Sequence, residues 1–323
     1  MMFEEQIARK PNLYPWTQEF IDAIWSTHWT PNEFNFLSDK KQFHQDLTDE
    51  QRAVITRTLS AIGQIEIAVK TFWANLGDNL PHPGLKDLGY VMANNEVIHN
   101  QAYEKLLDVL RLTDAFEANL KEDVVAGRVN YLRKYNKRTY EDDRKQYIYA
   151  ITLFTLFVEN VSLFSQFLII NHFNRFHNVL KDTAQQVEYT RVEEQLHANV
   201  GIRIINTLRK EYPELFDDEL VARVKHEAQE ALIAESNVIR WIMGGYSEKG
   251  LSDDILIAYI TNRINVSMQD IGFDVKLPLD RGLLEYTYWM DEESTGTGNY
   301  DFFHKRDIAY GKSTQSFADD DLF

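Results

Sequence analysis

The sequence contains no cysteine, which excludes disulfide bonds and iron–sulfur clusters and is consistent with a cytoplasmic protein. Any chemistry that needs a thiol must therefore use the thiol of another chain. Glycine and proline are scarce, at 14 and 7 of 323 residues, which favours long helices over strands and turns. Basic residues number 34 against 50 acidic ones, and the resulting net charge of −16 argues against a nucleic acid partner.

Two short runs with the same spacing stand out among the residues that are present. Glu96 precedes His99 by three residues, and Glu194 precedes His197 by three residues. Positions i and i+3 share one face of an α-helix, so each run can direct a carboxylate and an imidazole to one point. Two such helices that face each other, with one Glu from each of two more helices, provide the ligands of a carboxylate-bridged dimetal site in a helical bundle.

Two further glutamates meet this requirement. Glu159 lies near the middle of the apolar run 147–170, which approaches transmembrane length. A carboxylate at that depth disfavours a membrane span, so we interpret the run as a buried helix in which Glu159 needs a cation partner. Glu66 lies beside the apolar stripe of another expected helix. Oxygen and imidazole ligands without thiolate suit manganese or iron rather than structural zinc.

The expected architecture is all-α. Thr48 is the predicted N-cap of a helix over about 49–76, and Gln51 can close a capping box with it. Residues 1–47 are expected to form an arm on the main body, and 114–146 to mix helix and loop. The other helices are expected over about 85–112, 147–170, 173–210, 217–243 and 252–271. We interpret 1–290 as one domain, followed by a flexible C-terminal tail at 291–323 whose acidic end cannot fold alone.

Several motifs together resemble the class I ribonucleotide reductase small (β) subunit, and they occur in the order found in that family. Residues 96–103 are similar to its E-x-I-H-x-x-x-Y motif, and 193–197 to its [DE]-E-x-x-H motif. Residues 29–33 are similar to the arm motif W-x-P-x-E, and 302–310 to an FFEKR-like segment that ends in a tyrosine. The end, SFADDDLF, is similar to the peptide that docks on the large subunit.

The resemblance implies a ferritin-like bundle and the radical-generating subunit of an aerobic ribonucleoside-diphosphate reductase, a homodimer that works with a large (α) subunit. Trp29 and Tyr310 would relay an electron between the metal pair and a cysteine of the large subunit, which agrees with the lack of cysteine here. Glu193 would link Trp29 to the ligand His99. Two metal ions would be held by six residues, namely Glu66, Glu96, His99, Glu159, Glu194 and His197.

The resemblance also bears on the identity of the metals. The commonest subclasses have Asp at the first ligand position, whereas this chain has Glu66, with Lys70 four residues later. An ammonium there can pair with Glu66. This combination is similar to the dimanganese subclass Id, in which superoxide oxidises the pair to a Mn(III)Mn(IV) state. Tyr103 occupies the place of the stable tyrosyl radical of other subclasses, so a diiron or dimanganese tyrosyl-radical cofactor and a manganese–iron pair stay open.

A different class of protein shares the same ligand pattern. A ferritin-like metal-storage or oxidase protein would need the bundle and the ligands, but neither Trp29 nor an acidic tail. Among the remaining histidines, His172 and His177 lie near each other in the sequence but have no carboxylate three residues earlier. We interpret both as structural residues.

Overall fold

The computed structural model describes residues 1–66 and 69–290, except for the Glu66 side chain. Within these residues every named element is a helix, and the only strand-like pairing is an isolated bridge between Glu248 and Leu251. The all-α prediction is therefore confirmed. The predicted linker and acidic tail, residues 291–323, lie outside the described residues.

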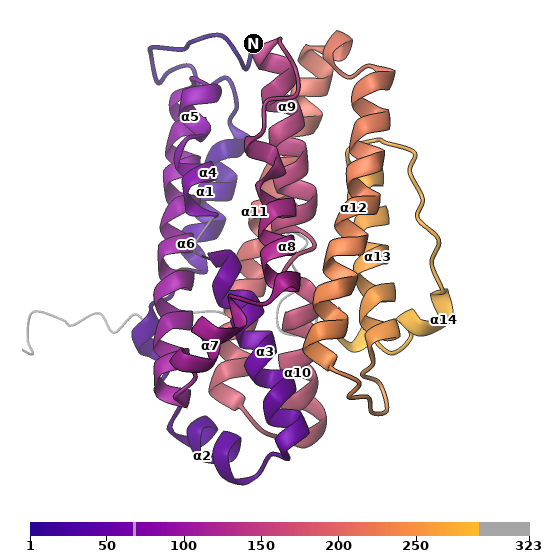
Figure 1. Ribbon diagram of the computed structural model, residues 1–323. Coiled ribbons are helices and arrows are strands. Elements are labelled where there is room, and N and C mark those ends of the chain that lie inside the picture. Colours follow the sequence, from indigo (N-terminus) through magenta and orange to yellow (C-terminus); the bar gives the residue numbers. More distant parts are fainter. Residues whose placement is uncertain (67–68, 291–323) are drawn as a thin grey trace, which may run out of the picture.

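Long helices run side by side along one axis (Figure 1). Those that carry or enclose the predicted ligands are α3 (Asp49–Glu66), α6 (Pro83–Leu110), α9 (Asp143–Leu153), the π-helical segment η3 (Phe154–Glu159), α10 (Phe164–His177) and α11 (Lys181–Glu211). Two more helices, α12 (Asp218–Met243) and α13 (Asp253–Asp270), form a layer on one side of them, and α1 (Trp16–Ser26) packs on α6 on the other side (Figure 1).

Shorter helices connect and cover the long ones. They are η1 (Pro31–Glu33), α2 (Leu37–Gln45), α4 (Lys70–Ala74), α5 (Leu76–Asn79), α7 (Thr113–Asn119), α8 (Asp123–Leu132), η2 (Arg133–Asn136), η4 (Pro213–Leu215) and α14 (Arg281–Leu284). Residues of the N-terminal segment enter the core, since Phe20, Trp29 and Phe36 are all buried.

The predicted start of α3 is confirmed in detail. The Gln51 N–H donates to the Thr48 hydroxyl at 3.2 Å, and the Thr48 N–H donates to the Gln51 side-chain oxygen at 3.0 Å. These reciprocal bonds satisfy two donors that a helix start would otherwise leave without partners. Both bonds are local, which is why the sequence could predict them.

The helix expected over 49–76 is divided in the structure. The helix α3 ends at Glu66, and the separate helices α4 and α5 follow from Lys70. Here α4 packs against α6 at a close approach, because a Cβ atom on Gly89 of α6 would lie 2.5 Å from the Trp73 carbonyl oxygen. The chain from Lys70 onward thus packs closely on α6 in short helices.

The apolar run is buried inside the protein, as predicted. The stretch Asp143–His177 has the length and hydropathy of a membrane span, but the apolar window within it is entirely buried in the fold. It is not one regular helix, because η3 interrupts it and a turn at 160–163 leads into α10. A π-helical turn inside a helix is frequently found at functional sites, and Glu159 is the last residue of η3.

Candidate metal centre

Three elements bring four of the predicted ligands together in the core. Glu96 lies on α6, Glu159 ends η3, and Glu194 and His197 lie one turn apart on α11. One ligand atom from each residue can be chosen so that all four lie within 4.8 Å of one another, and all four residues are buried. The shared helix face predicted for Glu194 and His197 is what lets both side chains reach this point.

His99 joins this cluster from α6. Its Nδ1 lies 3.2 Å from Glu194 Oε1 and 3.5 Å from Glu96 Oε2. His197 approaches from the other helix, with Nδ1 2.9 Å from Glu96 Oε1 and 3.5 Å from Glu159 Oε2. The two Glu-x-x-His pairs therefore face each other, and each imidazole points a nitrogen at carboxylates.

The sixth predicted ligand is Glu66. It ends α3, but its side chain lies outside the described part of the structure. Five of the six predicted ligands are therefore seen to converge, and the role of Glu66 stays a prediction.

The crowding of carboxylates governs the protonation of the cluster. Burial raises the pKa of Glu194, and the charges of Glu96 and Glu159 raise it further, well above its ordinary range. Burial would also raise the pKa of Glu96, but the approach of the His197 and His99 rings outweighs burial and lowers it. Burial favours neutral His197, yet Glu159 and Glu96 raise its pKa to about 9. Without a metal ion, protons would have to supply positive charge to this cluster.

The donor set fits metal ions better than protons. Several buried atoms of the cluster make no hydrogen bond to the described residues: both oxygens of Glu96, Oε2 of Glu159, Oε1 of Glu194 and both ring nitrogens of His197. Buried polar atoms in proteins are normally hydrogen-bonded. Electron-pair donors that face one another in this way are suited to a cation, and carboxylate oxygens mixed with imidazole nitrogens suit manganese or iron.

Glu193 lies on α11 beside the cluster and connects two rings. Its Oε2 accepts a hydrogen bond from the indole N–H of Trp29 at 2.9 Å, and the same oxygen lies 2.7 Å from Nε2 of His99. The Trp29 and His99 rings lie 6.1 Å apart at 23° to each other. All three side chains are buried. An unbroken contact path thus runs from Trp29 to the cluster, through the residues that the sequence analysis selected.

Trp73 is a functional candidate that the sequence analysis missed. This fully buried residue of α4 donates its indole N–H to Glu159 Oε1 at 2.8 Å, and its ring lies 6.2 Å from that of His197. It therefore orients a predicted ligand, as hydrogen bonds around metal sites commonly do. The two residues lie 86 positions apart in the chain, so no local sequence pattern could have indicated this contact.

The remaining predicted site residues are Tyr103, Lys70 and Tyr310. The buried Tyr103 donates its hydroxyl to the Thr190 hydroxyl at 3.4 Å. Lys70 is half-buried and begins α4, whereas Glu66 ends α3. Glu66 and Lys70 thus belong to separate helices, so the expectation that they share one face of a single continuous helix is wrong. Tyr310 lies outside the described residues.

Comparisons with known proteins identify relatives of this chain. Residues 6–277 match the family model described as ribonucleotide reductase, small chain. Among curated relatives, the ribonucleoside-diphosphate reductase subunit beta of Halalkalibacterium halodurans is 23% identical over 316 residues, which cover 96% of this chain and 90% of the relative.

Solved structures confirm the ferritin-like helical bundle. The ribonucleotide reductase R2 subunit from Clostridium botulinum is similar with a TM-score of 0.75 at 20% identity, and the match covers 87% of this chain and 88% of that one. A variant of an R2-like ligand-binding oxidase with a Mn/Fe cofactor is similar with a TM-score of 0.68 at 18% identity, and the match covers 82% and 96%. At these identities the structures show the fold alone.

Proposed function

The chain belongs to the ribonucleotide reductase small-chain family, and we propose that it is the radical-generating β subunit of an aerobic class I ribonucleoside-diphosphate reductase. The observation that carries this proposal is the buried contact path from the carboxylate–imidazole cluster through His99 and Glu193 to Trp29. A metal-storage protein would need the cluster, but storage would not require a buried Trp29 hydrogen-bonded to Glu193, the residue that contacts the ligand His99.

Two metal ions would be held by the five converging residues together with Glu66. We propose that the ions are manganese; in the Mn(III)Mn(IV) state that superoxide would generate, the pair would supply a one-electron oxidant. The support is Glu66 at the first ligand position, with Lys70 following it. The alternatives are a diiron or dimanganese cofactor with a radical on Tyr103, or a manganese–iron pair.

The chain's own residues would prepare the site for this chemistry. As a carboxylate, Glu193 only accepts hydrogen bonds, so its contact with Nε2 of His99 requires the proton on that nitrogen. The other ring nitrogen, Nδ1, then presents its lone pair toward Glu96 and Glu194. The same Glu193 oxygen holds the indole of Trp29. One carboxylate thus sets the imidazole tautomer and the position of the indole together.

The path would continue beyond the described residues. We propose that Tyr310 is the next relay station and that the acidic end docks on the large (α) subunit, which provides the cysteine that this chain lacks. The chain would act as a homodimer in the cytoplasm, without nucleic acid or membrane partners.

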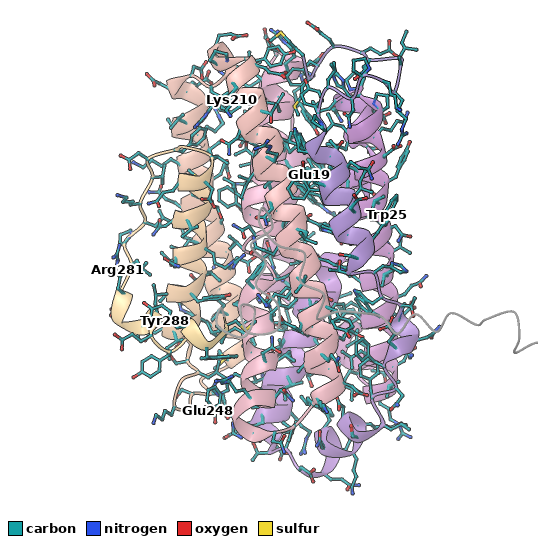
Figure 2. The ribbon with its side chains drawn as sticks, turned by 180° about the vertical axis from the view of Figure 1, so that it is seen from behind. Glu19, Trp25, Lys210, Glu248, Arg281 and Tyr288 are labelled. Atoms are coloured by element: carbon teal, nitrogen blue, oxygen red, sulfur yellow. The ribbon has the colours of Figure 1, made fainter. Side chains whose placement is uncertain are left out.

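The substitution Trp29→Phe tests the proposed path. It keeps an aromatic ring but removes the indole N–H, so nucleotide reduction with the large subunit should fall to background. The metal content and the EPR signal of the activated cofactor should stay unchanged. Trp25→Phe is the matched control, since Trp25 is 61% exposed on the outer face of α1 (Figure 2). Full reductase activity of Trp29→Phe would refute the path.

Activation with oxygen and, separately, with superoxide tests the choice of metal. EPR of the purified protein should show a coupled two-manganese signal and no tyrosyl signal after superoxide treatment. A persistent tyrosyl radical in iron-loaded protein would overturn the dimanganese proposal and leave the β-subunit proposal in place.

An oxidase that acts on its own bound substrate is the second candidate, because an R2-like ligand-binding oxidase shares the fold. Removal of residues 310–323 separates the two functions. A β subunit should lose its binding to the large subunit while it keeps its metals, whereas an oxidase should be indifferent to the deletion.

A further inference from the structure

A second cluster of metal-ligand side chains lies away from the dimetal centre. His172 and His177 of α10 meet Glu248, which lies between α12 and α13. Nε2 of His172 and Nε2 of His177 are each 2.8 Å from the same oxygen, Oε1 of Glu248, and Nε2 of His177 is 3.0 Å from Oε2. The two imidazoles thus converge on one carboxylate from one side.

The local structure holds these three groups in place. Glu248 and Leu251 exchange backbone hydrogen bonds of 2.9 and 3.0 Å across a turn that contains Gly250 with a positive φ of 84°. The buried Leu251 anchors this turn in the core. His172 is itself buried, and the ring of Phe176 packs 4.7 Å from its imidazole. The turn that presents Glu248 is therefore fixed relative to α10.

The cluster is accessible to solvent at two of its three residues. The His177 and Glu248 side chains are 31% and 23% exposed, and Glu248 lies at one end of the molecule (Figure 2). An ion could enter from solvent and keep a water molecule in a remaining coordination position. A metal site needs such an entry path in addition to its ligands.

We propose that His172, His177 and Glu248 form a mononuclear site for a divalent transition metal of the Zn²⁺ type, which fastens the α12–α13 loop to α10. Two imidazoles and one carboxylate match the ligands that Zn²⁺ takes when one position is left to water. Ligand atoms around a tetrahedral ion with bonds of about 2.0–2.1 Å lie about 3.3 Å apart. The three groups must therefore separate by about half an ångström, which the two partly exposed side chains permit.

The sequence analysis interpreted both histidines as structural because no carboxylate precedes either of them by three residues. The carboxylate in question follows them by 71 to 76 positions. The site is independent of the proposed reductase function, since it shares no residue with the dimetal cluster.

Metal counting on the full-length protein tests the proposal. The protein is first loaded with Mn²⁺ at the dimetal centre, then titrated with Zn²⁺ alone and dialysed, and both metals are counted by mass spectrometry. One Zn²⁺ per chain should bind while the manganese is retained. In His177→Ala the Zn²⁺ affinity should fall about 100-fold, and in Glu248→Gln, which keeps the shape of the side chain, at least about tenfold. His226→Ala, at an exposed histidine of α12, should bind like the parent.

Thermal melting gives a second readout. Zn²⁺ should raise the melting temperature of the Mn²⁺-loaded parent and of His226→Ala, but not that of His177→Ala or Glu248→Gln, because an ion that binds only the folded state stabilises it. Displacement of manganese by zinc with no extra ion bound would overturn the proposal. Equal Zn²⁺ binding by the parent and by both site variants would overturn it too, and would leave a hydrogen-bonded His–Glu–His cluster only.

Discussion

Single hydrogen bonds fix the orientation of the side chains around the dimetal cluster. Oε2 of Glu193 contacts Nε2 of His99, the ring nitrogen that does not face Glu96 and Glu194. The Trp73 indole donates to the Glu159 carboxylate at 2.8 Å. Each bond restrains a side chain whose ligand atom faces the centre of the cluster. Metal sites gain affinity from such outer contacts, because the ligands are already oriented when the ion arrives.

The substitution Trp73→Phe tests this role at one residue. It keeps most of the buried aromatic volume but removes the N–H that orients Glu159, so the affinity for Mn²⁺ should fall about 10- to 100-fold. Mn²⁺ binding isotherms would measure the loss, with circular dichroism to verify the helical fold. The exposed Trp25→Phe variant again serves as the control. An unchanged affinity would show that the hydrogen bond to Glu159 does not matter for metal binding.

Asp217 has two roles at the start of α12. Its side chain caps the helix, and its charge pairs with Lys145. Its Oδ1 accepts the Leu220 N–H at 2.9 Å, which caps the helix, and its Oδ2 lies 2.7 Å from Nζ of Lys145. The hydrogen bonds from Lys145 and from the Leu220 N–H lower the pKa of Asp217. Its stabilising effect is therefore complete above the unfolded-state pKa of about 3.9 and is lost as the pH falls through the lower folded-state pKa.

Two substitutions separate the cap from the charge. Asp217→Asn keeps the cap and should lower the free energy of unfolding at pH 7 by less than about 1 kcal/mol, because the ion pair is partly exposed. Asp217→Ala also removes the cap and should cost about 1 kcal/mol more. Urea unfolding between pH 7 and pH 3 would measure both. The difference between the parent and Asp217→Asn should shrink toward pH 3, and a constant difference would contradict the linkage.

At the scale of elements, the position of Glu159 depends on how η3 packs against α11. Gly201 lies one turn after His197 on α11 and faces Thr155 of η3. A Cβ atom on Gly201 would lie 2.8 Å from the Thr155 Cβ and would overlap the rest of that side chain. The absence of a side chain at Gly201 thus lets the π-helical segment approach the helix that carries two ligands.

The substitution Gly201→Ala should separate these two elements. Overpacking at such a contact costs about 1–3 kcal/mol, and the displacement of η3 should also weaken metal binding through Glu159. Chemical denaturation followed by circular dichroism, together with Mn²⁺ titration, would measure both effects. Gly127→Ala is the matched control, because a Cβ on Gly127 of α8 meets nothing within 4 Å. That variant should gain up to about 1 kcal/mol from the higher helix propensity of alanine, and equal losses in both variants would argue against the close-packing explanation.

At the scale of the whole molecule, the sequence predicted features that depend on local geometry. The two Glu-x-x-His pairs and the Thr48 capping box rest on spacings of three residues, which a helix converts directly into contacts. The π-helical turn packs closely on α11, which lies far along the sequence, so periodicity predicted a continuous helix there instead. The contact of Trp73 with Glu159 likewise joins residues 86 positions apart.

Arg128 also makes contacts between residues that lie far apart in the sequence. Its hydrogen bonds connect α8 to α12, to α3 and to the turn after η3. This buried residue of α8 donates from Nε to Glu235 Oε1 on α12 at 2.8 Å and from Nη1 to the Ala61 carbonyl on α3 at 2.9 Å. Its Nη2 donates to the Ser162 carbonyl in the turn after η3. Burial raises the pKa of Glu235 even though Arg128 opposes the shift. Burying the charged Arg128–Glu235 pair therefore has a large desolvation cost. The complete set of hydrogen bonds to Arg128 is needed to offset it.

A double-mutant cycle tests this coupling across the molecule. Glu235→Leu leaves the guanidinium buried without its carboxylate and should lower the free energy of unfolding by about 3–5 kcal/mol. Arg128→Met should cost less at pH 5 than at pH 8, because the isolated Glu235 carboxyl can then hold a proton. The double variant Arg128→Met/Glu235→Leu should lose less than the sum of the single losses, although the Ala61 and Ser162 carbonyls remain without their donor. Urea unfolding would give the coupling free energy, and strictly additive losses would show that the pair does not act as a unit.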